Sequence, residues 1–243
     1  MENIPYARHI VKNIFGTVEG LIGEREGQFL YSVAKGCKGE KGVIVEIGSW
    51  KGRSTICLGK GSIAGSKVKI YAIDPHRDTS TQEYYKVKTS YEEFKNNIRD
   101  AGVDDVIFPI MKTSEEAARI FNEPIEFLFI DGEHDYENVK LDFESWYPKV
   151  IYGGFIAFHD YNFSGPYKVI EKYVFISKYF KIMGIIGSIL FVQKVEINSL
   201  KDRLLNAFLF LMFKCAFSYN RLHFPKPATK LTVRALRILK IIK

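Results

Sequence analysis

Runs of apolar residues recur along this chain in two patterns. Short runs rich in β-branched residues and bounded by glycine or Asp-Pro are typical of buried parallel strands, whereas apolar residues three or four positions apart indicate amphipathic helices. The predicted strands cover residues 42–48, 68–74, 106–110, 125–130 and 154–159, and the predicted helices cover 19–35, 53–60, 84–101, 114–121, 136–147 and 167–173. Strands that alternate with helices in this way predict an α/β fold with a doubly wound, mostly parallel sheet.

The end of this alternating region has a different pattern. Apolar residues 179–185 and 188–193 meet at a Gly-Ser pair, with no room between them for a helix. They predict an antiparallel hairpin that closes the sheet. The length suits one such domain plus an appendage, so we assign residues 1–200, with a helical lead-in, to the domain and residues 201–243 to a basic helical extension.

Positive charge is concentrated in that extension. Residues 201–243 contain ten Lys and Arg residues against one acid, Asp202, so the extension carries +9 and the remaining 200 residues carry −2 of the net +7. A near-neutral body is not typical of a protein whose active face binds phosphates. We therefore expect no nucleic-acid partner.

Two stretches of the extension are apolar. Residues 204–213 are too few to span a bilayer, and residues 230–243 have helical spacing with a basic face. One interpretation is a peripheral contact with an anionic membrane, at its inner face, which would suit a lipid-linked glycan precursor as substrate. The other is a pair of helices packed on the domain or on a second subunit, as in a homo-oligomer.

The cysteines indicate a reducing setting. Cys37, Cys57 and Cys215 are far apart and form no C-x-x-C pair, and the first residues lack the pattern of a signal peptide. We expect a cytoplasmic protein in which these cysteines are packing residues.

Residues 45–55, Val-Glu-Ile-Gly-Ser-Trp-Lys-Gly-Arg-Ser-Thr, run from a strand through a glycine loop into a helix. Gly48 and Gly52 permit a tight turn and close approach of the backbone to a ligand, as in nucleotide-binding loops. The G-x-x-x-G spacing differs from the G-x-G-x-x-G of dinucleotide-binding domains and lacks the Gly-Lys-Ser/Thr of a P-loop. An ordinary strand-to-helix turn would also explain it.

Polar residues follow the second and third predicted strands. Asp74 lies 26 residues after Gly48, where a carboxylate can accept hydrogen bonds from both ribose hydroxyls. Thr113 and Ser114 are weaker candidates to flank an adenine, since they would equally suit a helix N-cap. His76 follows Asp-Pro and would either line an acceptor pocket or be exposed, and we expect it to be exposed.

Ionisable side chains follow the fourth and fifth predicted strands. Carboxyl ends of parallel strands meet at one edge of a sheet, where α/β proteins bind ligands. The polar residues expected to converge there are Asp131, Glu133, His134, His159 and Asp160. The sequence therefore predicts a functional site at this edge.

Residues 45–55 resemble the first motif of class I S-adenosylmethionine-dependent methyltransferases. The later patterns Ile-Asp-Gly-x-His-x-Tyr at 130–136 and Gly-Gly-x-Ile-x-x-His-Asp at 153–160 resemble the O-methyltransferases of macrolide sugars and the related cephalosporin-pathway enzyme. The resemblance covers about residues 20–195. It implies a Rossmann-like methyltransferase fold that ends in an antiparallel hairpin.

The resemblance also implies a cofactor, S-adenosylmethionine. Glu46 would face its ammonium end, Gly48 and Gly52 would frame the loop, and Asp74 would bind the ribose. The full set of residues assigned to the cofactor is Glu46, Gly48, Ser49, Gly52, Ser54, Asp74, Thr113, Ser114 and Asp131.

The same relatives imply the reacting groups. His134 matches their general base, with Asp131 as the second catalytic residue, and Asp131, His159 and Asp160 match their magnesium site. Position 159 departs, because the macrolide enzymes have a carboxylate there. Magnesium prefers oxygen ligands, so an imidazole weakens such a site or favours manganese, iron or zinc. Two interpretations of this site therefore remain open: it binds a divalent cation (Mg or Mn), or His159 and Asp160 form a metal-free hydrogen-bonded pair.

Methyl transfer from a sulfonium requires alignment of the acceptor and removal of its proton, which a histidine can accept. We expect O-methylation of a sugar, glycan or other small-molecule hydroxyl, in glycan biosynthesis. One alternative is a nicotinamide-dependent oxidoreductase, but the G-x-G-x-x-G motif of its cofactor-binding domain is absent from the sequence. A second, a non-catalytic cofactor-binding module, does not explain His134. Nucleic-acid methylation would call for an Asn-Pro-Pro-Tyr type of motif, which is absent from the sequence.

Overall fold

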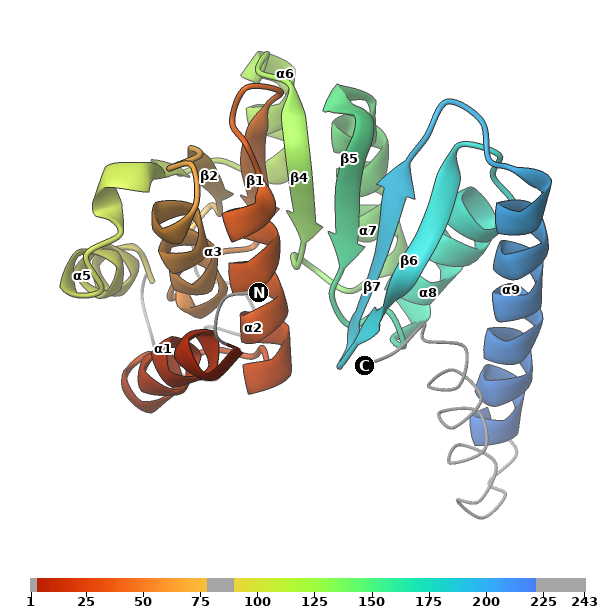
Figure 1. Ribbon diagram of the computed structural model, residues 1–243, viewed down its shortest axis with the longest axis horizontal. Helices are drawn as coiled ribbons and strands as arrows, with labels where there is room; N and C mark the ends of the chain where they lie inside the picture. The colour runs from red at the N-terminus through yellow and green to blue at the C-terminus, as the bar shows by residue number, and fades with distance from the viewer. Residues whose placement is uncertain (1–3, 78–89, 222–243) are drawn as a thin grey trace.

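The computed structural model describes residues 4–77 and 90–221 of the chain (Figure 1). The first residues of the predicted helix 84–101 and the whole predicted basic helix 230–243 lie outside the described residues.

The described strands form one sheet of seven strands in the order β3-β2-β1-β4-β5-β7-β6. Strands β1 to β5 run parallel to one another, and β7 is antiparallel to both β5 and β6. Their bounds are β1 Val43–Ile47, β2 Ile70–Ile73, β3 Ile107–Ile110, β4 Ile125–Ile130, β5 Val150–Phe158, β6 Phe180–Ile186 and β7 Ile189–Lys194. The predicted α/β fold and its closing hairpin are confirmed.

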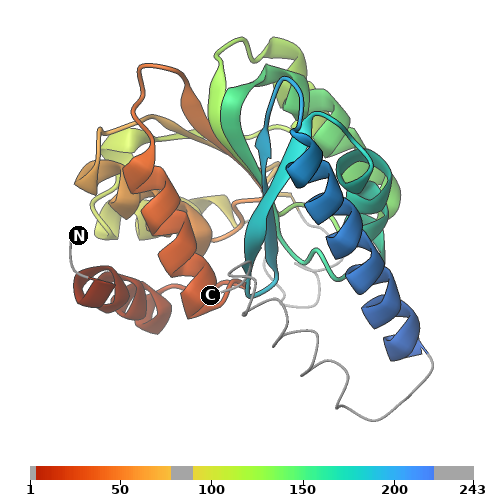
Figure 2. The ribbon, with the colours of Figure 1, turned by 45° about the vertical axis from the view of Figure 1, so that its right-hand side comes forward.

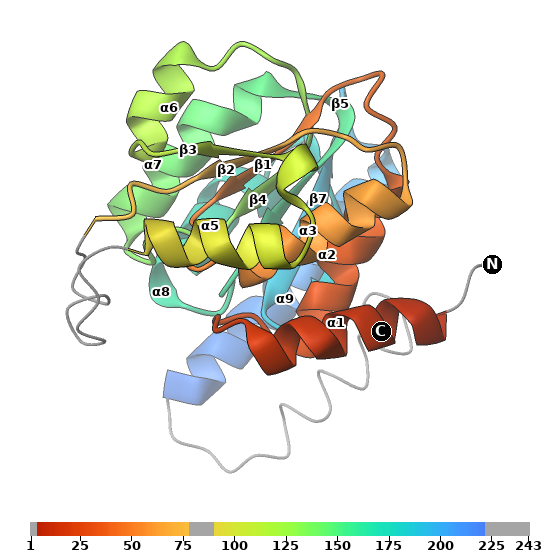
Figure 3. The same ribbon diagram turned by 90° about the vertical axis from the view of Figure 1, so that its left-hand side faces the viewer.

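Helices cover both faces of this sheet (Figure 3). On one face lie α1, α2, α3 and α5, and on the other lie α6, α7 and α8, with α9 packed on β6 at the edge of the sheet (Figures 1 and 2). The bounds are α1 Ile4–Thr17, α2 Glu24–Gly36, α3 Arg53–Ala64, α5 Tyr91–Asp100, α6 Ser114–Ile120, α7 Tyr136–Trp146, α8 Ser164–Val169 and α9 Leu200–Arg221, with short turns η1 Asp104–Val106, η2 Tyr147–Lys149 and η3 Ile170–Phe175.

Several predicted boundaries were wrong. Strand β5 begins at Val150 rather than at residue 154, and α3 ends at Ala64 rather than at residue 60. The helix predicted from residue 19 begins at Glu24, because Gly20 and Gly23 fall in a loop and Glu26 caps the helix by accepting a hydrogen bond from the Gly23 amide. The helix predicted over residues 167–173 begins at Ser164 and continues as the π-helical turn η3. The sequence analysis also missed α1.

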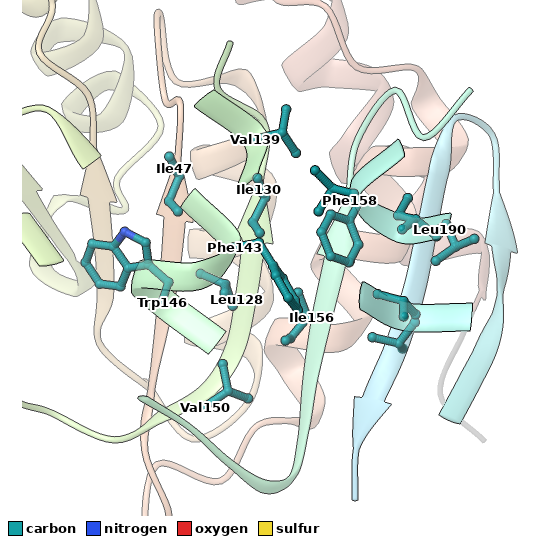
Figure 4. Close-up of a cluster of buried hydrophobic side chains, with 14 of the residues drawn as sticks. Ile47, Leu128, Ile130, Val139, Phe143, Trp146, Val150, Ile156, Phe158 and Leu190 are labelled. Atoms are coloured by element: carbon teal, nitrogen blue, oxygen red, sulfur yellow. The ribbon is translucent and has the colours of Figure 1, made fainter. Parts of the chain in front are cut away.

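The strands separate two apolar cores. Alternate residues of β1 face opposite sides: Val45 and Ile47 pack with α7 and α8, whereas Ile44 packs with α2 and α3. Figure 4 shows the first core, in which Phe143 and Trp146 of α7 are buried against the sheet. Burying a large apolar side chain contributes about 1.5–3 kcal/mol, so both faces hold the strand ends in place.

Glu46 is a charged residue inside the apolar strand β1. It is fully buried, and its Oε2 accepts a hydrogen bond of 2.5 Å from the Thr55 hydroxyl of α3. This bond ties β1 to α3 across the glycine loop. Burial raises the pKa of Glu46 to about 8, against the weaker opposing effect of hydrogen bonds from Ser54 and Thr55.

Gly48 is held in a left-handed conformation at the end of β1. Its φ is +85°, and a Cβ there would lie 2.1 Å from the Asp131 carbonyl oxygen. Gly153 has the same φ of +85°, but a Cβ added there would meet no atom within 4 Å.

These two glycines give a matched pair of substitutions. We expect Gly153→Ala to lower the free energy of unfolding by about 1–2 kcal/mol, which is the cost of the left-handed backbone. Gly48→Ala should lower it by more than about 3 kcal/mol, because the backbone near Asp131 must also shift. Urea denaturation measures both, and equal losses would contradict the close approach.

The pKa of Glu46 predicts a pH-dependent stability. Between pH 4.5 and about 8, the folded protein still holds the Glu46 proton that the unfolded chain has released. The stability of the wild type therefore falls as the pH rises through that window. Glu46→Gln has no such proton, so its melting temperature should match the wild type near pH 4.5 and exceed it by several degrees at pH 8. The exposed Glu24→Gln serves as control. A difference that does not change between the two pH values would contradict the prediction.

Candidate active site

Four strand ends are brought together by the backbone itself. The residue after β1, Gly48, donates its N–H to Ile73 O at 2.8 Å, and Asp131 donates to Ile47 O at 2.9 Å. Asp74 donates to Ile110 O at 3.2 Å, and His159 to Ile130 O at 3.0 Å. The parallel ladder therefore continues one residue beyond each strand and places Gly48, Asp74, Asp131 and His159 along one edge.

A cleft of about 470 Å³ opens along this edge. Among the predicted site residues, those that line it are Gly48, Ser49, Gly52, Ser54, Asp74, Thr113, Ser114, Asp131, Glu133, His134, His159 and Asp160. Glu46 does not line it, since its side chain lies beneath the glycine loop against Thr55. The structure thus gathers every predicted site residue except Glu46 at one cavity.

Backbone strain is concentrated around the cleft. The non-glycine residues with positive φ among those described are Trp50, Lys67, His76 and Asp160, and all but Lys67 lie at or within three residues of a strand end that borders the cleft. Such conformations cost about 1–3 kcal/mol and persist where surrounding contacts enforce them.

The glycine loop approaches Asp74 closely. The Trp50 N–H donates to Asp74 Oδ2 at 2.8 Å, and Gly52, at φ +90°, is the N-cap of α3. The Ser49 hydroxyl is buried and has no hydrogen-bond partner among the described residues. A buried hydroxyl without a partner is costly, and a polar ligand in the cleft would satisfy it.

Asp74 is positioned by two backbone amides. Its Oδ1 accepts from the His76 N–H at 2.7 Å, in addition to the Trp50 contact. The prediction that His76 is exposed was wrong, because its ring is 3% exposed between Tyr91 and Phe94 and its Nδ1 lies 2.8 Å from the Ser90 hydroxyl.

The far end of the cleft is formed by α6 and α7. Thr113 is the N-cap of α6, bonded reciprocally with Glu116, and Ser114 Oγ accepts from Trp146 Nε1 at 2.9 Å. Asp142 of α7 also lines the cleft, and burial raises its pKa to about 7. Sequence analysis missed Asp142 because it lies inside a helix with no motif around it.

An acid and histidine cluster occupies the other end. His159 Nδ1 lies 2.8 Å from Asp131 Oδ1 and 3.4 Å from Asp160 Oδ2, and His134 Nε2 lies 3.1 Å from Asp160 Oδ2. Neither buried nitrogen, His159 Nδ1 or His134 Nε2, has hydrogen-bond geometry to any described partner. Ligand atoms of Asp131, His134 and His159, one from each, lie within 4.8 Å of one another, close enough to hold a metal ion.

Glu26 of α2 is a member of this cluster that the sequence did not reveal. It is buried, and its Oε2 lies 3.6 Å from His159 Nε2. It lies in the first turn of α2, 105 residues before Asp131, and no motif surrounds it in the sequence. It also caps the helix by accepting a hydrogen bond from the Gly23 N–H.

The carboxylates set the protonation of the histidines. Burial by itself would lower the pKa of His159, but Asp131 and Glu26 raise it to about 10. Asp160 raises the pKa of His134 by direct contact. Glu26 has its pKa lowered to about 2, because His159, Gly23 and Ser188 together outweigh its burial.

Residues 18–23 form one wall of the cleft. Arg53 of α3 donates to Val18 O at 2.7 Å and to Gly20 O at 2.6 Å, which fixes the loop over the glycine turn. Gly20, Leu21 and Ile22 line the cleft, and Leu21 is largely exposed.

Comparisons with known proteins agree with this arrangement. A family model described as a methyltransferase domain matches residues 45–161. "Uncharacterized protein R132" of Acanthamoeba polyphaga mimivirus is 31% identical over 165 residues, which cover 64% of this chain and 66% of that protein. "Uncharacterized protein y4gI" of Sinorhizobium fredii is 29% identical over 48% of this chain but only 13% of its own length. The chain thus spans less than two thirds of each of these relatives.

A solved structure shares the fold. The O-methyltransferase from Bacillus cereus, in complex with SAH, superposes with a TM-score of 0.51 at 19% identity, over 80% of this chain and 93% of that one. Residues 45–161 therefore match the methyltransferase domain family, and they lie within a fold that known methyltransferases share.

Proposed function

We propose that this protein is an S-adenosylmethionine-dependent methyltransferase that acts on a hydroxyl oxygen. The observation that carries the proposal is the single cleft in which the glycine loop, Asp74 and the acid and histidine cluster all meet. The methyltransferase match over residues 45–161 covers the motifs that form this cleft.

The glycine-loop end of the cleft suits S-adenosylmethionine. Gly48 and Gly52 bring backbone to the cavity without a Cβ, the unpartnered Ser49 hydroxyl faces a ligand-sized space, and Asp74 has lone pairs left for ribose hydroxyls. Thr113, Ser114 and Asp142 lie where an adenine would be enclosed. Bound there, the cofactor supplies a methyl group on a sulfonium leaving group.

Glu46 would act indirectly on the cofactor. Since it lies beneath the loop rather than in the cleft, its role would be to hold the loop through Thr55. The sequence-based assignment of direct contact with the ammonium group therefore has no support from the geometry, although the residue supports the loop that would bind it.

His134 is proposed as the general base. Asp160 lies 3.1 Å from its Nε2, and the centroid of the imidazole ring lies 5.3 Å from that of the half-exposed Phe163, with the two rings tilted by 51°. The Phe163 ring offers a flat apolar surface on which the apolar face of a pyranose would pack. A sugar or glycan hydroxyl as acceptor fits this combination of base and aromatic surface.

A divalent cation fits the residues of the cluster. Asp131 and the Nδ1 of His159, which belong to a group of ligand atoms within 4.8 Å of one another, would hold it together with Asp160, and these are donor atoms of the types that manganese, iron and zinc accept. When bound, such an ion lowers the pKa of an acceptor hydroxyl. His134 would then remove the proton, while the cleft walls at Leu21 and Ile22 exclude water.

The cofactor is tested by calorimetric titration with S-adenosylhomocysteine and, separately, with NAD. Wild-type protein should bind S-adenosylhomocysteine at micromolar concentration and not NAD. Asp74→Ala should weaken binding about 10–100-fold through the loss of charge-assisted hydrogen bonds to the ribose, and the exposed Asp105→Ala should not. If the wild type binds NAD and does not bind S-adenosylhomocysteine, an oxidoreductase is the better proposal.

The same preparations test His134. His134→Asn should bind S-adenosylhomocysteine with wild-type affinity, while transfer of labelled methyl to p-nitrophenyl α-L-rhamnoside as acceptor probe falls about 10²–10⁴-fold. Unchanged transfer would remove His134 from the base role.

We also propose a peripheral contact with an anionic membrane through α9. Exposed apolar residues form a stripe along the helix at Leu200, Leu204, Phe208 and Leu211, while its other side packs on β6 through Leu209 and Asn206. Lys201, Arg203 and Lys214 are exposed beside the stripe, and six Lys or Arg residues and no acid follow in residues 222–243. None of the described helices is both long and apolar enough to cross a bilayer.

Vesicle co-sedimentation tests this surface. The full chain should bind phosphatidylglycerol-containing vesicles at 0.1 M salt, and Leu204→Ser with Phe208→Ser should abolish binding while leaving S-adenosylhomocysteine affinity intact. Ile120→Ser, an equally exposed change on α6, is the control. If the double variant still binds vesicles, or if it loses dimerisation instead of vesicle binding, α9 contacts something other than a membrane.

A further inference from the structure

Glu26 lies where the first described helices meet the acid and histidine cluster. Its Oε1 accepts from the Ser188 N–H at 2.5 Å and from the Ser188 hydroxyl at 2.7 Å, and its Oε2 accepts from the Gly23 N–H at 2.5 Å. The carboxylate therefore joins the start of α2 to the turn between β6 and β7. It is 6% exposed, so its charge is largely shielded from water.

These contacts fix Nε2 of His159 as a hydrogen-bond donor. The Ser188 hydroxyl gives its hydrogen to Glu26, so its oxygen is left to accept from His159 Nε2, 3.0 Å away. Nε2 is thus a donor, directed at Ser188 and Glu26. Nδ1 faces Asp131 and Asp160, and a metal ion bound between them would displace its proton and use the lone pair left on that nitrogen.

A histidine bound to a metal almost always donates its second ring N–H to a carboxylate or similar acceptor, which fixes the ring and its tautomer. His159 has this arrangement: one nitrogen directed at Glu26 and Ser188, the other buried, without a hydrogen bond, and facing two carboxylates.

We propose that Glu26 is a positioning residue that, with Ser188, orients His159 as the nitrogen ligand of a first-row transition ion, and that the site prefers this ion to magnesium. The proposal rests on the divalent cation of the proposed function. Glu26 does not touch the ion. It acts by holding the ring of His159 with its Nδ1 lone pair toward Asp131 and Asp160.

Metal binding to the full chain tests the proposal without turnover. Mn²⁺ is titrated and followed by the EPR signal of the free ion, and the visible absorption of added Co²⁺ reports nitrogen ligation. Wild-type protein should bind Mn²⁺, and Mg²⁺ should displace it only at more than about 100-fold excess. Displacement at equal concentration, or no Mn²⁺ binding, would overturn the proposal.

Glu26→Gln should weaken Mn²⁺ binding about 10–100-fold and change the Co²⁺ spectrum, while S-adenosylhomocysteine affinity in EDTA stays at the wild-type value. Glu24→Gln, the same change on an exposed residue of α2, should alter neither. Wild-type Mn²⁺ affinity in Glu26→Gln would contradict the positioning role.

If Glu26→Gln fails to fold, Ser188→Ala takes its place, since it removes only the hydroxyl that accepts from His159. It should also weaken Mn²⁺ binding, and an unchanged affinity would overturn the proposal. Failure of the cofactor proposal has a different signature: no S-adenosylhomocysteine binding by the wild type, with Mn²⁺ binding still present.

Discussion

The backbone ladder at the carboxyl edge of the sheet is the constraint on which the cleft depends. Each residue that follows β1, β2, β4 and β5 donates its N–H to the last residue of a neighbouring strand. Four side-chain positions from distant parts of the chain are thereby fixed by main-chain bonds, before any side chain contributes. The apolar cores on both faces keep the strands in register, and so the ladder holds the site.

The sequence predicted this frame because its signals are local. Runs such as 43–47 and 125–130 identify buried strands, and Gly48, Asp74, Asp131 and His159 each follow a strand directly. Parallel pairing places them on one edge of the sheet, and the order β2-β1-β4-β5 makes them neighbours there. Helix boundaries were less accurate where capping decides them, as at Gly23, since that bond depends on a side chain three residues later.

Other parts of the site could not be predicted from local pattern. Glu26 and Asp142 are single acids within amphipathic helices, and such acids are usually exposed. His76 is buried because Tyr91 and Phe94 enclose it, a contact across a loop. Glu46 looked like a ligand contact, but the alternation of β1 directs it toward α3, away from the cleft.

The two ends of the cleft are built differently, and this difference bears on what each end can specify. The end at Gly48 and Gly52 is made mainly of backbone, which any chain with this strand-to-helix turn can reproduce, so it suits a cofactor common to a large family. The other end is made of side chains from α2, β4, β5 and the turn before β7. Its properties follow from individual residues such as His159 in place of a carboxylate. Under the proposed function, the choice of ion and of acceptor would therefore be made at that end, by residues particular to this chain.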